Sequence, residues 1–315
     1  MRSSRKILTM IRATFALLVL LSCAGFAGGA DQDHDGLSDE FEQNLLAKFA
    51  PVFHVSANDC AGLPAEFMPD SVQPVAAAAN GTIYGQVFRR GPYIEIHYYH
   101  LWAKDCGSLG HTLDAEHVSG LLSAGDTSKA LYWFAAAHQA TVCELNSGSS
   151  AAALHAEEHG PDVWISEGKH ASFLTSDLCG RGCGADTCKL TKRLEPSRII
   201  NIGEPGAPMN GAIWVNSTAW PMASKMTTDF DASRLAALQA SGGELVLFRP
   251  SPSTQAVISA AGAGPRYTAG ALDTAGNHTD SALDSAERHT RKSLAASRRS
   301  VINFLRGGKE KSASK

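Results

Sequence analysis

Residues 93–101 read YIEIHYYHL, with isoleucine at alternate positions in the first half. Side chains of a strand point alternately to its two faces, which places Ile94, Ile96 and Tyr98 on one face and His97 and Tyr99 on the other. Isoleucine and tyrosine both favour strands. The stretch therefore predicts a strand with one largely apolar face.

Further short apolar runs, separated by turn sequences such as Asn80-Gly81, extend this pattern along the chain. Many short strands with Gly and Pro turns are typical of a sandwich of two sheets. We therefore expect a mainly β protein, a β-sandwich with a few short peripheral helices. The expected strands are residues 51–55, 82–88, 93–101, 118–122, 130–136, 163–165, 198–202, 212–215 and 244–248, and the expected helices are 40–49, 149–158 and 231–240.

The composition excludes several classes of protein. The chain has 315 residues, of which 44% are hydrophobic and 19% are charged. This is enough apolar material for a domain with a sizeable core, and it argues against collagen, coiled coil and wholesale disorder. The net charge of −3 gives no support to nucleic-acid binding, because such proteins are usually basic.

Residues 1–30 have the pattern of a secretory signal peptide. Four basic residues without an acidic one precede the apolar run at 16–21, and small residues follow up to Ala30. The apolar run is shorter than the roughly 20 residues of a transmembrane helix. Leu20-Leu21-Ser22-Cys23 also resembles a bacterial lipobox. The alternatives are therefore a secreted protein and one anchored in the bacterial envelope by a lipid on Cys23.

The rest of the chain divides by charge into an acidic body and a basic tail. Residues 256–315 carry ten basic and five acidic residues and few large apolar ones, which predicts a flexible tail. Residues 31–255 carry 14 basic and 26 acidic residues, a net charge of −12. An acidic exported body favours cation binding. We expect a calcium loop and helix at 31–50 and the β-sandwich at 51–255.

Six cysteines remain once Cys23 is assigned to the export signal. An even number in an exported chain favours three disulfides, although the spacing does not decide how the cysteines pair. The alternative is a zinc cluster in the dense segment 179–188, but zinc sites more often have two residues between paired cysteines. The six disulfide candidates are Cys60, Cys106, Cys143, Cys179, Cys183 and Cys188.

Residues 31–42 read DQDHDGLSDEFE and match a calcium loop at every ligand position. Ca²⁺ takes six to eight oxygen ligands, which such a loop supplies from positions 1, 3, 5, 7, 9 and 12, with Gly at position 6 for the sharp turn. Gly36 occupies that position, and a helix is expected to follow. The helix that precedes the loop in an EF-hand is missing, so this is a half-hand. The predicted Ca²⁺ ligands are Asp31, Asp33, Asp35, the Leu37 carbonyl, Asp39 and Glu42.

A second cation pattern lies at residues 98–118, YYHLWAKDCGSLGHTLDAEHV. Asp114 and Glu116 would point to the same face of a strand, where two carboxylates repel unless they share a proton or a cation. Carboxylates suit Ca²⁺ or Mg²⁺, and His111 and Asp105 are close enough in sequence to join them. The alternative is a hydrogen-bonded cluster without metal. His170, after another expected strand, is a candidate for lining the same site.

At these residues the chain resembles the necrosis- and ethylene-inducing-like (Nep1-like, NPP1) proteins, whose heptapeptide GHRHDWE corresponds to Gly110–Glu116, GHTLDAE. Residues 46–60, LAKFAPVFHVSANDC, look like the family's first strand and cysteine, and residues 162–174, DVWISEGKHASFL, are similar to Vps62-type sandwich proteins. The resemblance implies a central β-sandwich. It also implies a divalent cation, Mg²⁺ or Ca²⁺, at the positions matching Asp105, His111, Asp114 and Glu116.

The family docks a sugar head group of a membrane glycolipid at that site and damages membranes. The departures here are Thr112, Leu113 and Ala115, which replace the family's Arg, second His and Trp between the matching ligands. Cation binding therefore carries over better than toxicity does. We expect a secreted monomer that binds a carbohydrate or glycolipid head group, with a membrane surface as a further partner.

The competing interpretation is a metal-dependent secreted hydrolase. Asp114 and Glu116 would suit acid–base cleavage of a polysaccharide. Alternatively, His155-Ala156-Glu157-Glu158-His159 matches the His-x-x-Glu-His motif, in which His155 and His159 hold Zn²⁺ and Glu158 polarises water. Gly160-Pro161 would end such a helix at once. The chain is therefore expected to be a binding protein rather than an enzyme.

Overall fold

The computed structural model describes residues 29–249, except 107–109, 126–127, 140–142, 183–185, 221 and 223–224. The expected signal peptide with Cys23, the expected tail and Cys183 lie outside the described residues. Within the described part of the chain, no helix is long and apolar enough to cross a membrane.

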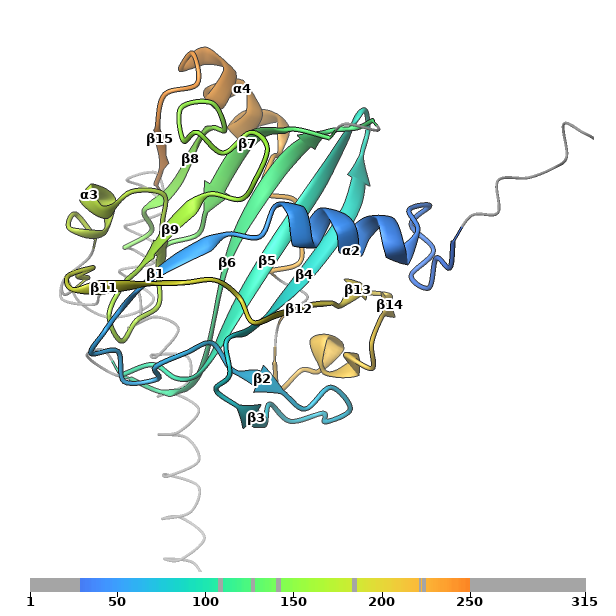
Figure 1. Ribbon diagram of the computed structural model, residues 1–315, viewed down its shortest axis with the longest axis vertical. Coiled ribbons are helices and arrows are strands. Elements are labelled where there is room, and N and C mark those ends of the chain that lie inside the picture. Colours follow the sequence, from blue (N-terminus) through green and yellow to red (C-terminus); the bar gives the residue numbers. More distant parts are fainter. Residues whose placement is uncertain are drawn as a thin grey trace, which may run out of the picture.

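A seven-stranded sheet forms the centre of the molecule, in the order β12-β4-β5-β6-β7-β8-β15 (Figure 1). Its neighbours are antiparallel except β12 and β4, which run parallel. The strands are β12 (Arg198–Asn201), β4 (Thr82–Arg90), β5 (Tyr93–Lys104), β6 (Thr112–Ser123), β7 (Ala130–Ala135), β8 (Asn146–Ser150) and β15 (Val246–Phe248).

A four-stranded sheet, β10-β9-β1-β11, packs across one face of the seven-stranded sheet, which makes the predicted sandwich (Figure 1). Its strands are β10 (Ser172–Phe173), β9 (Asp162–Ile165), β1 (Val52–Ser56) and β11 (Thr191–Leu194). The remaining elements are the strand pairs β2 (Glu66–Phe67) with β3 (Ala76–Ala78) and β13 (Gly203–Glu204) with β14 (Ala207–Pro208), the helices α2 (Asp39–Lys48), α3 (Ser176–Cys179) and α4 (Ala232–Ala240), and the 3₁₀ helix η1 (Ile213–Asn216).

β5 has hydrophobic core on both of its faces. As its alternation predicts, Ile94, Ile96 and Tyr98 share one core cluster, which also contains Phe53 of β1. The opposite face is buried too, because segments that follow β12 cover it with Trp214 and other large side chains. Polar side chains on this second face therefore lie out of water as well.

Helix α2 forms within one residue of the bounds expected for it, 40–49. The Ser38 hydroxyl accepts a hydrogen bond from the Phe41 NH, and acidic residues occupy the first turn, where they interact favourably with the helix dipole. The helix lies across the seven-stranded sheet (Figure 1) and buries Leu45 and Leu46 against it. Helix α2 thus joins the N-terminal loop to the sandwich core.

The helix expected at 149–158 is absent. β8 continues to Ser150, and turns follow in which His155 has a positive φ of 54°. The Ala151 NH donates to the Leu131 carbonyl at 2.9 Å, which ties the segment to the neighbouring strand, and the bonds that follow are those of turns, such as His155 NH to the Ala152 carbonyl at 3.1 Å. Cross-strand bonding overrides a weak helical preference here.

The strand expected at 212–215 is also wrong, because these residues form η1 instead. Asn210 and Gly211 both have positive φ angles and turn the chain, and the Val215 NH then donates to the Ala212 carbonyl at 3.2 Å. The turn delivers Trp214 into the core cluster that also contains Trp220. Burial of these rings is compatible with a short helix as well as with a strand.

We expect Gly85→Ala to destabilise the protein by about 1–3 kcal/mol, the usual cost of overpacking a core. A Cβ atom at Gly85 would lie 2.2 Å from Leu46 Cδ2, so the helix would have to move off the sheet. Urea unfolding measures the change. Gly206→Ala is the control, because a Cβ atom there meets no atom within 4 Å. Equal losses in the two variants would contradict this account of the packing.

Candidate functional site

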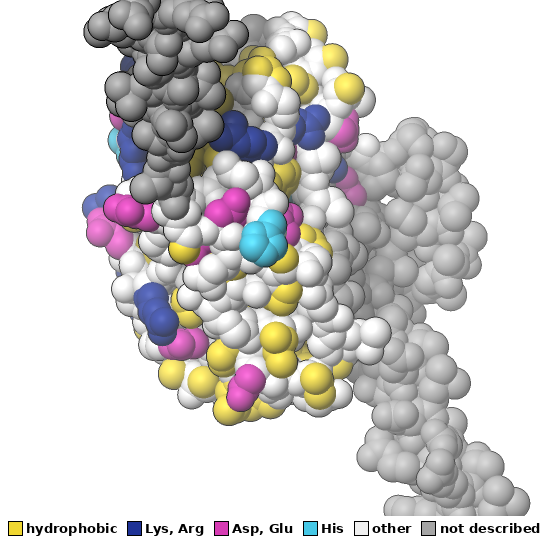
Figure 2. Space-filling model, turned by 90° about the vertical axis from the view of Figure 1, so that its right-hand side faces the viewer, with side chains coloured by type: hydrophobic (Ala, Val, Ile, Leu, Met, Phe, Trp, Pro, Cys, Tyr) yellow, Lys and Arg dark blue, Asp and Glu magenta, His cyan; other side chains and the backbone are white. Residues whose placement is uncertain are grey.

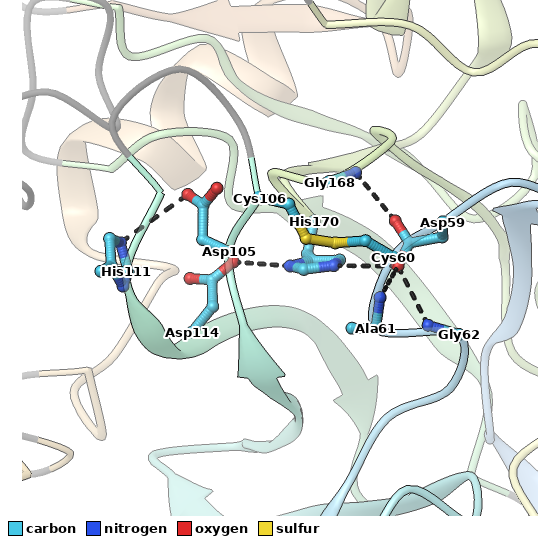
Figure 3. Close-up of a disulfide and its surroundings, with 10 residues drawn as sticks. All are labelled: Asp59, Cys60, Ala61, Gly62, Asp105, Cys106, His111, Asp114, Gly168 and His170. Carbon is cyan, nitrogen blue, oxygen red and sulfur yellow. Dashed lines mark hydrogen bonds and ion pairs between the residues drawn. A yellow bond between two sulfur atoms is a disulfide. The ribbon is translucent and has the colours of Figure 1, made fainter.

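The four metal ligands expected from the sequence lie around the connection between β5 and β6. Asp105 follows β5, His111 precedes β6, and Asp114 and Glu116 are in β6. The Asp105 NH donates to the His111 carbonyl at 2.8 Å, which closes the connecting loop at its base. In Figure 3 the carboxylates of Asp105 and Asp114 both lie near the His111 ring.

One nitrogen of the His111 ring, Nε2, is available as a metal ligand. Its Nδ1 lies 2.7 Å from the Leu113 carbonyl, which can only accept, so Nδ1 carries the proton in the neutral ring. Nε2, 3.7 Å from Asp105 Oδ2, then keeps its lone pair. A backbone carbonyl that fixes the tautomer in this way is common behind metal-binding histidines. The side chain is 14% exposed, so this site reaches solvent.

Asp114 and Glu116 point to the same face of β6, because only Ala115 separates them and strand side chains alternate. They pair across the sheet with Trp102 and His100 of β5, respectively. Leu113, just before them, has a φ of 72°, which turns the chain from the loop into the strand. The same-face arrangement expected from the sequence therefore exists in the fold.

His170 lies directly behind this site and contacts two carboxylates. Its Nδ1 is 2.8 Å from Asp114 Oδ2, and its Nε2 is 3.3 Å from Asp59 Oδ1 (Figure 3). The ring is fully buried and stacks on Trp102, with ring centroids 4.1 Å apart. With both nitrogens engaged, His170 positions Asp114 rather than binding an ion itself.

His170, Asp59 and Asp114 stabilise one another in their charged forms. Burial disfavours a charged His170, but hydrogen bonds to Asp114 and Asp59 outweigh it and raise the pKa of His170 to about 9. Burial likewise opposes ionised carboxylates, yet His170 holds the pKa of Asp59 at about 2 and lowers that of Asp114. At neutral pH a buried histidinium thus sits between two carboxylates, and Asp114 presents a negative charge to the site.

The predicted four ligands are neighbours, but they do not form a compact ligand set. Among the described residues, two groups bring at least three ligand atoms within 4.8 Å of one another: Asp31, Asp33 and Asp35, and separately His97, His117 and Asp229. Carboxylates that repel one another take other partners when no cation holds them together. The cation at the β5–β6 connection therefore stays a prediction.

The N-terminal loop has the geometry expected of a calcium loop. Gly36 adopts a φ of 88°, and its NH donates to Asp31 Oδ2 at 3.2 Å, which curls the loop around its carboxylates. Asp33 and Glu42 are buried, with exposed fractions of 5% and 0%. Five buried carboxylate oxygens have no hydrogen-bond partner: Asp31 Oδ1, Asp33 Oδ1 and Oδ2, Asp35 Oδ2 and Glu42 Oε1.

The loop carboxylates of Asp33 and Glu42 have raised pKa values, because nearby positive charge does not offset burial and mutual repulsion. Burial, followed by the charges of Asp35 and Asp31, raises the pKa of Asp33 to about 6. Burial, followed by the charges of Asp33 and Asp35, raises the pKa of Glu42 to about 8. Unpartnered buried oxygens that repel one another are the donor set that a hard divalent cation requires, so the residues present fit Ca²⁺.

The second compact group lies on the other face of the seven-stranded sheet. Asp229 Oδ2 is 2.9 Å from His117 Nε2 and accepts from the Ser119 hydroxyl at 2.7 Å. Asp229 Oδ1 accepts from Arg234 at 3.2 Å, and His97 Nε2 lies 2.9 Å from Glu95. Protein donors thus already satisfy both Asp229 oxygens. Sequence analysis missed the group because Asp229 follows β6 by more than 100 residues, with no local signal.

Disulfides join several of the predicted cysteines. Cys60 bonds to Cys106 and Cys179 to Cys188. Cys143 is disulfide-bonded as well. The Cys60–Cys106 bond ties the segment after β1 to the loop that begins at Asp105 (Figure 3), so it braces the candidate site.

The His-x-x-Glu-His segment does not form the helix that the zinc-protease interpretation needs. Residues 151–159 are turns and bends, and Glu158 pairs with Lys129 at 2.6 Å on the surface. His159 Nδ1 lies 2.7 Å from the Gly160 carbonyl. Without a helix, His155 and His159 are not placed on a common face.

Solved structures similar to this chain are Nep1-like proteins. "NLPPya in complex with mannosamine" is 18% identical, with a TM-score of 0.39 over 69% of this chain and 95% of that chain. A necrosis and ethylene inducing protein from the causal agent of cocoa's witches' broom disease is 18% identical, with a TM-score of 0.34 over 64% and 90%. The non-toxic protein HaNLP3 is 13% identical, with a TM-score of 0.35 over 65% and 99%.

These are members of the family that the sequence motifs resemble. No protein-family model matches the chain, and no curated protein matches it in sequence. All three TM-scores lie below 0.5, so this similarity does not indicate a function. The evidence for function comes from the residues of this chain.

We expect His170→Asn to lower the free energy of unfolding by roughly 3–5 kcal/mol at neutral pH, the usual cost of removing one member of a buried ion pair. Asn tolerates the left-handed backbone at this position, where φ is 55°. The raised pKa of His170 stabilises the fold fully below pH 6.5, and this stabilisation is lost as the pH rises through 9. The variant should lack this alkaline decline.

Urea unfolding between pH 6 and 10, with EDTA present, measures both effects. His54→Gln is the control, because that histidine pairs with Asp162, whose side chain is 57% exposed, and such pairs contribute at most about 1 kcal/mol. A decline between pH 6.5 and 9 that persists in His170→Asn would refute the assignment.

Proposed function

We propose that the protein is a secreted, cation-dependent carbohydrate-binding protein whose site is Asp105, His111, Asp114 and Glu116. The observation that carries the proposal is the arrangement around Asp114. Its carboxylate is held ionised by buried His170, while the His111 ring beside it reaches solvent. An ionised carboxylate and an imidazole nitrogen can share a divalent cation, which in turn can bind sugar hydroxyl groups.

Mg²⁺ or Ca²⁺ would be held by the carboxylates, with His111 Nε2 as the nitrogen ligand. The ion would supply open coordination positions for two neighbouring hydroxyl oxygens of a sugar. The protein's part is to orient the ligands, through His170 behind Asp114 and through the disulfide behind Asp105. A glycolipid head group is the sugar source we propose, with a membrane surface as its setting.

Secretion is part of the proposal. Disulfides persist in oxidising compartments and are rare in reducing ones, and the signal-like residues 1–30 provide a route for export. Lipid attachment at Cys23 is the alternative form of the same route.

We also propose that the N-terminal loop binds Ca²⁺ and stabilises the fold. Its support is the set of buried carboxylate oxygens without partners, which includes Glu42 Oε1. Because Leu37 packs into the main core cluster, an ion that orders this loop would also stabilise the core.

The sugar site is tested by an Asp114→Ala/Glu116→Ala double variant. Calorimetry should show one class of divalent-ion site fewer than in the unchanged protein, because these carboxylates supply most of its negative charge. Mannosamine and glucosamine are suitable first probes, because both are bound in solved structures of similar proteins. Sugar binding should disappear in the variant and in EDTA.

Thr112→Ala is the matched control, because Thr112 is exposed on the same strand and supplies no charge. Undiminished divalent-ion affinity in the double variant would reject the site. Release of cleaved product from a glycan would instead favour the hydrolase alternative, since binding alone leaves the sugar intact.

The calcium loop is tested by thermal unfolding with Ca²⁺ and with EDTA. At 100 times the Kd, Ca²⁺ should stabilise the protein by about 2.7 kcal/mol, and Glu42→Gln should abolish this gain. Glu40→Gln is the control, because Glu40 is exposed on the same helix. Since the pKa of Asp33 is about 6 and that of Glu42 about 8, binding should release protons and become tighter from pH 5 to 8. An unfolding temperature that does not respond to Ca²⁺ would exclude the loop site.

A further inference from the structure

We infer that the N-terminal loop does not complete its calcium site alone: Glu204, in β13 of the sandwich, supplies a further carboxylate ligand. The bound ion would then join the loop to the edge of the seven-stranded sheet. This inference depends on the calcium binding proposed above and adds to it the residue through which the ion acts on the sandwich.

The loop is short of one expected ligand. Asp39 occupies the ninth position, but both of its carboxylate oxygens accept hydrogen bonds from Gln32, at 2.9 Å from the backbone NH and 2.7 Å from Nε2. The ninth position of such a loop often reaches Ca²⁺ only through a water, and Ca²⁺ takes up to eight oxygens, so its coordination shell has room for a further carboxylate oxygen.

The sandwich brings its own polar groups to the loop. Asn201, the last residue of the edge strand β12, donates from Nδ2 to Glu42 Oε2 at 3.0 Å, and both residues are buried. This contact orients Glu42 and leaves its other oxygen, Oε1, without a partner. The final ligand position of the loop is thus held in place by the edge of the sheet.

Glu204 follows closely along the chain. The Gly203 NH donates to Asn201 Oδ1 at 3.1 Å, and Gly203 has a φ of 69°, so the backbone turns sharply between Asn201 and Glu204. A Cβ atom at position 203 would lie 2.7 Å from Met209, which leaves room for glycine alone in this turn. The turn keeps the Glu204 side chain near the residue that contacts the loop.

One oxygen of the Glu204 carboxylate accepts a hydrogen bond and the other has none. Oε2 accepts from Gln86 Nε2 at 3.1 Å, whereas Oε1 is buried without a hydrogen bond. After burial itself, the charges of Asp33 and Asp35 are what raise the pKa of Glu204, to about 7. Glu204 Oε1 is thus a buried carboxylate oxygen without a hydrogen bond, as the open loop oxygens are, and it lies three residues along the chain from Asn201, which contacts Glu42.

The side of the molecule that carries this loop is shown in Figure 2, where acidic side chains lie near a histidine in the middle of the view. Lys and Arg side chains appear mainly above them in that view. Arg89 is a basic residue that acts on the loop carboxylates. Its charge lowers the pKa of Asp35, but burial and the charge of Asp31 raise that pKa by more. A bound divalent ion supplies the missing charge more completely.

The experiment compares Ca²⁺ affinity in Glu204→Gln and in the unchanged sequence, both carrying Asp114→Ala/Glu116→Ala so that only the loop site is measured. Gln keeps an oxygen that can accept from Gln86, and therefore preserves the local fold. Calorimetry should show about tenfold weaker Ca²⁺ binding in Glu204→Gln, since calcium affinity follows the number of charged ligands. Glu195→Gln, which removes the same charge from a side chain that is 69% exposed, should bind as before.

Europium luminescence separates a ligand from a distant charge. Decay rates of bound Eu³⁺ in H₂O and in D₂O give the number of coordinated waters, and the loss of a carboxylate ligand should add about one water in Glu204→Gln. A long-range charge effect would weaken binding without changing this number.

Weaker binding together with the additional water supports Glu204 as a ligand. An unchanged water number, or an affinity equal to that of Glu195→Gln, overturns this inference while leaving the calcium loop intact. Absence of Ca²⁺ binding at the loop both in the Asp114→Ala/Glu116→Ala background and in the unchanged protein overturns the loop proposal and this inference together.

Discussion

A carboxylate taken out of water needs a positive partner, because an unpaired buried charge costs several kcal/mol. The described part of this chain meets the requirement in two different ways. Asp59 and Asp114 share the buried His170, and Asp229 has His117, Ser119 and Arg234 around it. The carboxylates of residues 31–42 have no comparable set of partners, and their raised pKa values record that lack. The first two clusters have their partners inside the protein, whereas the loop keeps buried carboxylate oxygens without a hydrogen bond.

This difference separates two roles for cations. At the N-terminal loop the open oxygens are buried, so an ion bound there would have the protein itself as its partner and would serve stability. At the β5–β6 connection the imidazole of His111 reaches solvent, so an ion there could also contact a ligand. His170 makes the second role feasible, because it keeps Asp114 ionised and fixed without taking up the outer side of the site.

Local patterns predicted much of the fold. The alternation in β5, helix α2 and the half-hand loop each lie within about a dozen consecutive residues, where backbone geometry decides which side chains meet. The errors arose where local preference was weak: residues 149–158 extend β8 and then turn, and residues 212–215 form a short helix. In the first segment a backbone bond to β7 decides the conformation, and in the second the burial of Trp214 against distant parts of the chain does. The sequence also named Asp114 and Glu116 as neighbours on one face, which alternation along β6 explains.

The sequence by itself determined the sandwich class, the half-hand loop and the grouping of His111, Asp114 and Glu116, because each depends on spacing along one element. Only the tertiary structure decided the partners. His170 is 56 residues from Asp114 and 111 from Asp59, and Asn201 is 159 residues from Glu42. Such contacts form when the two sheets and helix α2 pack together, and no short-range pattern encodes them. Packing therefore decides which buried charges are neutralised by the protein and which are left for an ion.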